Sequence, residues 1–114
     1  MTPEALQPDG ILARLVADAV RLGANEMEFE YKDGYDEVFA MKGAMGVGIA
    51  NLDSSGEDDA ALRDELWAIR KKGKTLSVDG TTYHVKATTY DSFNETAFRV
   101  RIRRASDKPT CGTR

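Results

Sequence analysis

The chain has 114 residues, enough for one domain with a single core. Its net charge of −3 at pH 7 argues against a nucleic-acid-binding protein, whose surface is usually strongly basic. No uncharged apolar run approaches the ~18 residues of a membrane span, and the first ten residues include acidic side chains and no basic ones, unlike a signal peptide. We therefore expect a cytoplasmic protein without membrane insertion.

Metal and disulfide chemistry find little support in the composition. Cys111 is the single cysteine and His84 the single histidine, so the chain lacks an internal disulfide and the ligand cluster of a common zinc site. Cys111 is either a reactive thiol or a solvated tail thiol. The second interpretation is favoured because nothing near it is paired or apolar. We expect no metal and no other cofactor.

A polar lead-in covers residues 1–10, and a helix is predicted directly after it. The apolar side chains there recur at three- and four-residue spacing: Ile11, Leu12, Leu15, Val16, Ala19, Val20 and Leu22. Gly23 is a plausible end of this helix. The apolar stripe is wide, so the helix should pack on a sheet.

Strict alternation of polar and apolar residues over 26–32 predicts a half-buried strand. Asp33-Gly34 is a two-residue hairpin signal, because both turn positions need a positive φ. Residues 35–41 are the predicted partner strand.

Three glycines follow, at Gly43, Gly46 and Gly48. Their Gly-x-x-Gly-x-Gly spacing allows a phosphate-binding loop, but neither a helix start nor a Gly-Lys-Ser/Thr sequence directly follows them. A twisted strand with a bulge or a closely approached backbone is favoured.

A second helix is predicted over residues 58–72, with an acidic first turn and a basic last turn that suit the helix dipole. Ser54 with Glu57, or Ser55 with Asp58, makes a capping-box pattern. Gly73 ends the helix. Trp67 lies off the main apolar stripe and is either an edge of the core or an exposed interface anchor.

The residues after the second helix are predicted to form strands. Residues 76–78 and 81–89 flank the hairpin signal Asp79-Gly80, residues 90–95 are a predicted loop, and residues 97–104 form the last strand. We expect an α+β domain over residues 11–104, with two helices packed on a mainly antiparallel sheet of about six strands in two layers. Residues 105–114 are a predicted mobile tail.

Two ordered stretches carry a family resemblance. The first is residues 19–30, where a helix ends in Gly-Ala-Asn-Glu and runs into a strand. The second is residues 72–80, continued by 83–89, Ser92-Phe93-Asn94-Glu95 and the strand over 97–102. With the helix between them, they resemble the N-terminal, non-ATPase domain of the bacterial type II secretion and type IV pilus ATPases, which has "G-A-S-D-I-H-I-E", "D-G-R-I-S", "V-R-V-S-T" and "S-Y-G-E" at matching places.

That resemblance implies a domain that precedes a RecA-like ATPase domain and moves against it within a hexameric ring. Basic residues of its sheet can approach the neighbouring nucleotide, and two of the arginines at these places correspond to Lys74 and Lys86 here. This chain has no Gly-x-x-x-x-Gly-Lys-Ser/Thr motif to hold phosphates. We therefore expect an orphan domain that is not an enzyme.

The candidate ligand-binding residues are basic: His84, Lys86, Arg99 and Arg101 on predicted neighbouring strands, with Arg103 on the same strand face as the other arginines, and Lys74 at the edge of this group. They could form a patch for a phosphate group or an acidic partner. The alternative is the solvated face of an antiparallel sheet. Catalysis by His84 would need a nearby acid or nucleophile that the sequence does not identify.

Glu26, Glu28 and Glu30 occupy alternate positions of the first strand. They could bind a cation, or they could form a charged strand face that discourages edge pairing. The leading hypothesis for the whole chain is a protein-interaction or assembly module that binds a secretion or pilus component or itself. The alternative is a small-ligand or nucleotide sensor.

Overall fold

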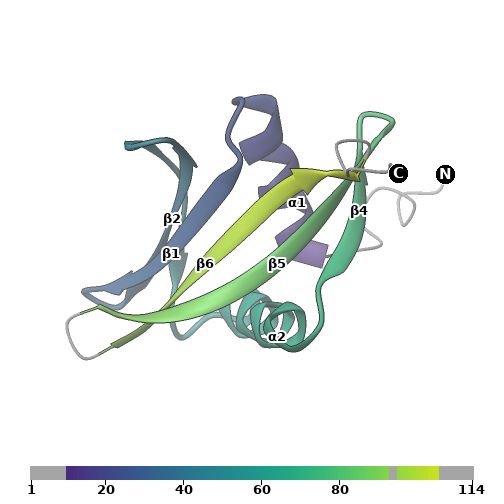
Figure 1. Ribbon diagram of the computed structural model, residues 1–114. Helices are drawn as coiled ribbons and strands as arrows, with labels where there is room; N and C mark the ends of the chain where they lie inside the picture. The colour runs from purple at the N-terminus through teal and green to yellow at the C-terminus, as the bar shows by residue number, and fades with distance from the viewer. Residues whose placement is uncertain (1–9, 93–94, 106–114) are drawn as a thin grey trace, which may run out of the picture.

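The computed structural model describes residues 10–92 and 95–105. The lead-in over residues 1–9, the tail over 106–114 with Cys111, and Phe93-Asn94 of the family-like stretch lie outside the described residues. Figure 1 shows the course of the chain. The elements are α1 (Gly10–Arg21), β1 (Glu26–Lys32), β2 (Tyr35–Lys42), β3 (Met45–Asp53), α2 (Glu57–Lys71), β4 (Lys74–Val78), β5 (Thr81–Ser92) and β6 (Glu95–Arg104).

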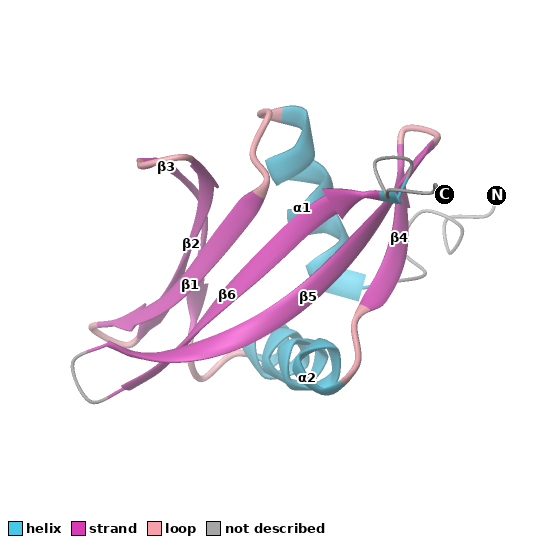
Figure 2. Cartoon of the chain, in the orientation of Figure 1, coloured by secondary structure: helices cyan, strands magenta, loops and turns pink. Residues whose placement is uncertain are grey.

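The six strands form one sheet in the order β3-β2-β1-β6-β5-β4, and every neighbouring pair is antiparallel. Each half of the chain contributes a helix and three strands, and the pairing of β1 with β6 joins the halves. Both helices pack on this open sheet (Figure 2). The predicted α+β fold is confirmed. Within the described residues, no helix is long and apolar enough to cross a membrane.

The core lies between the helices and one face of the sheet. In the middle of the sheet, Met27 is opposite both Ala40 and Val100, and Phe29 is opposite both Val38 and Phe98. The helices contribute the buried side chains of Leu12, Leu15, Val16, Ala19, Leu62, Leu66 and Ile69. The alternate residues of the strands point to the other face, which no described helix covers.

Both hairpin signals are confirmed. Asp33 and Gly34 have φ values of 53° and 87°, and Asp79 and Gly80 have values of 50° and 83°. Positive φ at both central residues is the conformation of the type I′ turn, whose twist matches that of the flanking strands.

The glycine-rich segment is a strand with a closely approached backbone, as favoured from the sequence. Gly46 and Gly48 lie opposite Met41 and Phe39, and the register shifts between Val38 and Phe39. A Cβ on Gly46 would lie 2.8 Å from Met41 Sδ, and one on Gly48 would lie 3.8 Å from the Phe39 ring. The side chains of Met41 and Phe39 on β2 therefore pack against the backbone of β3 at the two glycines.

Two local predictions are wrong. Gly56 is the N-cap of α2 and makes no side-chain cap hydrogen bond, so the capping box does not form. Ser55 instead donates from its N–H and Oγ to Asp53 Oδ1, at 2.9 and 2.8 Å. The loop predicted over residues 90–95 is mostly strand, because β5 continues to Ser92 and β6 begins at Glu95.

Trp67 lies at the edge of the core and is also partly exposed, so both predicted features are present. Its ring meets Phe98 edge-on at 5.0 Å between centroids, which places it at the border of the core. The residue is nevertheless 44% exposed, and the guanidinium of Arg70 lies 5.6 Å from the ring centroid.

Gly23 ends α1 in the left-handed region, with φ at +83°. The N–H of Ala24 donates to the carbonyl of Ala19 at 2.9 Å, closing the last turn. We expect Gly23→Ala to lower the free energy of unfolding by about 1–2 kcal/mol, because a Cβ is disfavoured at this φ. Urea unfolding measures the change. Gly48→Ala is the control, because its Cβ would make ordinary van der Waals contact with Phe39. Equal losses in the two variants would contradict this account.

Candidate functional site

Arg99 lies in the centre of the open face and is already engaged within the protein. Its Nη2 donates to Glu28 Oε2 at 3.2 Å, and its Nε lies 3.8 Å from Glu26 Oε2. Its guanidinium also lies over the ring of Tyr90, at 4.6 Å from the centroid. Arg99 is therefore a predicted ligand-binding residue whose charge is already neutralised by carboxylates on the same face.

The three glutamates of β1, Glu26, Glu28 and Glu30, also contact side chains of the open face. Glu26 and Glu28 face Arg99, while the hydroxyl of Tyr90 donates to Glu30 Oε2 at 3.0 Å. Burial raises the pKa of the Tyr90 hydroxyl, and the hydrogen bond to Glu30 raises it further. Within the described part of the chain, no group of three or more Asp, Glu, His or Cys side chains could hold a metal ion.

Four other basic residues lie opposite one another on β5 and β6, where strand parity assigns them to the open face. We call them the basic quartet: His84, Lys86, Arg101 and Arg103. The register places Lys86 opposite Arg101 and His84 opposite Arg103. Arg101 and Arg103 are exposed, and within the described residues neither side chain makes a hydrogen bond or an ion pair. The predicted basic patch therefore loses Arg99 and retains the basic residues nearer the end of β6. Arg103 is one of them.

The two β5 members of the quartet make local contacts. Lys86 Nζ donates to the carbonyl of Arg70 near the end of α2, at 3.4 Å. His84 Nδ1 lies 3.3 Å from Thr75 Oγ1 on β4. His84 Nε2 is buried and has no hydrogen-bond partner within the described residues.

Lys74 does not join this group. It is paired with Val85 and precedes the buried Leu76 by two residues, so its Cβ lies on the helix side of the sheet. Side chains two apart on a strand share a face, whereas His84 and Lys86 alternate with Val85. Lys74 was expected at the edge of the basic patch, and its strand parity instead assigns it to the other face of the sheet.

Two open hollows adjoin the quartet where β6 runs past the start of β1. The first measures about 400 Å³ and is lined by Asn25, Glu26, Gly43, Arg101, Ile102 and Arg103. The second measures about 440 Å³ and shares Asn25, Ile102 and Arg103 with the first. A ligand on the quartet therefore has room beside Arg101 and Arg103.

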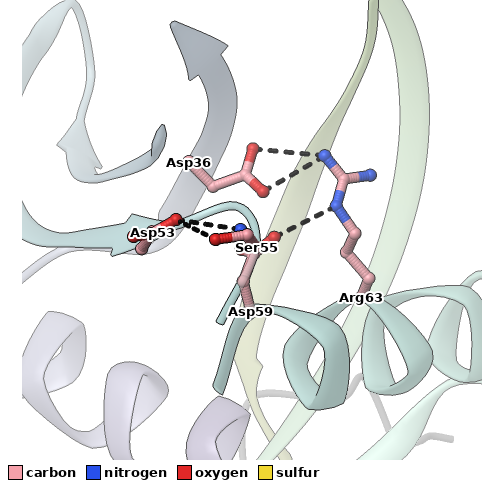
Figure 3. A network of polar contacts seen from close by, with 5 residues as sticks. All are labelled: Asp36, Asp53, Ser55, Asp59 and Arg63. Carbon is pink, nitrogen blue, oxygen red and sulfur yellow. Dashed lines mark hydrogen bonds and ion pairs between the residues drawn. The ribbon is translucent and has the colours of Figure 1, made fainter. Parts of the chain in front are cut away.

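A second polar cluster lies under the sheet and was not predicted. Asp36 of β2 and Asp59 of α2 are only 6% and 1% exposed, and Arg63 bridges them (Figure 3). Arg63 Nη2 lies 3.1 Å from Asp36 Oδ2, and its Nε lies 3.3 Å from Asp59 Oδ2. This cluster ties α2 to β2.

Burial raises the pKa of Asp59 to about 6, and the neighbouring carboxylate of Asp36 contributes to the shift. The positive charge of Arg63 lowers the pKa of Asp59, but one guanidinium cannot neutralise two carboxylates. A cavity of about 10 Å³ borders the cluster, also lined by Thr96 and by apolar side chains. That volume is close to the minimum for one water molecule.

The sequence did contain a signal for this cluster. Asp36 occupies the same strand parity as the buried Val38 and Ala40. Asp59 precedes Leu62 by three residues and Leu66 by seven, so it lies on the apolar stripe of α2. A charged residue at a core position of an otherwise regular pattern is the feature that could have identified both aspartates.

No protein-family model and no curated protein matches the chain.

Asp59 makes the stability dependent on pH. Its pKa in the folded protein lies above its ordinary value of 3.8, so its contribution to stability is present at pH 4 and lost as the pH rises through about 6. We expect Asp59→Asn to gain about 1–3 kcal/mol of unfolding free energy relative to the wild type between pH 4 and pH 7.5. Urea unfolding at each pH measures the difference.

Asp64→Asn, at an exposed position of the same helix, is the control. Its unfolding free energy should follow the wild-type curve. Parallel wild-type and Asp59→Asn curves over the whole range would show that Asp59 titrates normally.

Proposed function

We propose that the protein is a non-catalytic interaction module that binds an acidic segment of a protein partner through the basic quartet. The observation that carries this proposal is the register that sets Lys86 opposite Arg101 and His84 opposite Arg103. Like charges directly opposite each other on one face destabilise strand pairing. Arg101 also lies opposite Glu26 of β1, but that carboxylate is shared with Arg99. Carboxylates of a partner would relieve the repulsion that remains, so binding gains energy that the free protein does not have.

The two unpaired arginines suit carboxylate recognition. Arg101 and Arg103 are two residues apart on β6, and both are exposed. A guanidinium donates two parallel hydrogen bonds to a carboxylate, which fixes the orientation of the bound group. An extended segment with acidic side chains at alternate positions has the spacing that these two arginines require.

The position within the sheet favours a protein segment over a phosphate group. Phosphate-binding loops supply a nest of free backbone N–H groups. At His84, β5 is paired with β4 and β6 on its two sides, so its backbone donors there serve the sheet. At Lys86, β5 is paired with β6 alone. A phosphate beside His84 would therefore contact side chains alone, whereas an extended acidic segment can place carboxylates along several rows.

The sequence resemblance to the N-terminal domain of the secretion and pilus ATPases supports a partner from such an assembly, either a secretion or pilus component or a related ATPase domain. In this proposal the chain works in the cytoplasm and supplies a docking surface, while the chemistry belongs to its partner.

A nucleotide sensor is the second candidate. It rests on the hollow of about 400 Å³ beside Arg101 and Arg103, which has room for a phosphate-bearing ligand. The engagement of Arg99 by Glu26 and Glu28 weakens this candidate, because it removes one cation from the predicted phosphate site.

The acidic-partner proposal predicts binding of a fluorescein-labelled, glutamate-rich peptide, measured by fluorescence anisotropy. We expect the double variant Arg101→Glu/Arg103→Glu to weaken binding at least about tenfold, because it reverses the two unpaired charges. Added salt should weaken wild-type binding as well. The control is Arg14→Glu/Lys32→Glu, which makes the same charge change at exposed positions on α1 and at the end of β1.

Equal loss in the control variant would show a non-specific charge effect and would contradict the proposal. A thermal-shift series with ATP and ADP separates the second candidate. A rise in melting temperature that Arg101→Glu/Arg103→Glu abolishes, without peptide binding by the wild type, would favour the sensor.

A further inference from the structure

The two edges of the sheet differ in how they are protected. Edge strands expose backbone N–H and C=O groups and are usually kept short, charged or covered. β4 is five residues long, begins with Lys74, and ends beside the ion pair of Arg21 with Asp79 at 3.0 Å. β3 is nine residues long, and Asp53 at its end is its one charged residue.

β3 also exposes apolar side chains. Met45 is 74% exposed and Val47 is 52% exposed, the largest values among the exposed large hydrophobic residues with Leu22 at 53%. Val47 is paired with the buried Ala40, so it has the strand parity of the core. The apolar layer under the sheet thus continues to the edge at β3 and meets water there.

We propose that β3 pairs antiparallel with β3 of a second copy of this chain, so that the two sheets form one. A second copy fits because residues 45–52 are uncharged, so two copies meet without repulsion along this length. A symmetric dimer needs a self-complementary surface, and an uncharged strand paired with its own copy satisfies that condition.

The charges at the ends favour the antiparallel arrangement. Asp53 lies at one end of β3, and Lys42 lies at the other, immediately before the turn that leads into the strand. An antiparallel pair brings each Asp53 toward the Lys42 end of the other copy. A parallel pair would set the two Asp53 carboxylates side by side, which is unfavourable.

The pairing is independent of the proposed function. In the strand order, β2 and β1 separate β3 from the two strands that carry the quartet. Arg101→Glu/Arg103→Glu should therefore leave self-association unchanged, and substitutions on β3 should leave binding of the acidic peptide unchanged. Failure of one proposal is thus distinguishable from failure of the other.

Sedimentation velocity of the full chain, from about 5 µM to about 500 µM, tests the pairing in a range suited to a weak interface. We expect a concentration-dependent dimer for the wild type and a monomer for Val47→Lys, because an edge lysine blocks strand addition. Ser77→Lys, at an exposed position on the opposite edge, is the matched control and should still dimerise. A wild type that remains monomeric throughout would overturn the proposal.

If Val47→Lys fails to fold, Met45→Lys replaces it, because that side chain is more exposed. Disulfide cross-linking with Cys111 changed to serine tests the orientation. Gly48→Cys, next to the middle of β3, should cross-link more readily than Met45→Cys, because the two Met45 positions lie at opposite ends of an antiparallel pair. Ready cross-linking of Met45→Cys would overturn the antiparallel arrangement.

Discussion

The coverage of only one face of the sheet is the constraint from which the surface chemistry follows. The apolar residues of the strands lie mainly on the face that the helices cover. The residues between them lie on the open face and must therefore be stable in contact with water. Near the centre of the open face, opposite charges on neighbouring strands stabilise the exposed residues, because Glu28 of β1 forms an ion pair with Arg99 of β6. Farther along β6 the arrangement changes, because Arg101 lies between Glu26 of β1 and Lys86 of β5, and Arg103 lies opposite His84 of β5. The open face therefore has a neutralised centre and a more basic region toward the end of β6.

The cluster of Asp36, Asp59 and Arg63 makes the attachment of α2 depend on electrostatics as well as on packing. Two carboxylates and one guanidinium leave an excess negative charge in a place that water hardly reaches, which explains the raised pKa of Asp59. Removal of one partner from a buried ion pair typically costs about 3–5 kcal/mol, because the other charge is left uncompensated. Arg63 is thus the member on which the other two depend, and it is also the one that reaches the surface.

Periodicity was enough to predict the helices, the strands and both hairpins, because burial on one side imposes a regular pattern on each element. The Asp-Gly pairs were reliable because few residues accept positive φ at both turn positions. The candidate site was predicted only in part. Strand parity separates Lys74 from Lys86, and the tertiary pairing of β1 with β6 neutralises Arg99. The first fact could have been read from the alternation of Lys74, Leu76 and Val78, had the strand been predicted to begin at residue 74. The second could not, because it depends on the order of strands in the sheet.

The proposed strand pairing and the proposed binding face have a geometric relation that gives the dimer a property the monomer lacks. Continuation of a sheet through two antiparallel edge strands places the twofold axis perpendicular to the sheet, so both open faces lie on the same side. Both basic quartets would then face one partner surface, at a separation set by the strands between them. A partner with two acidic segments would bind the second quartet at a high effective concentration, so that weak individual contacts sum to firm attachment. Self-association at β3 would in this way control the strength of binding at β5 and β6 without any change in the quartet itself.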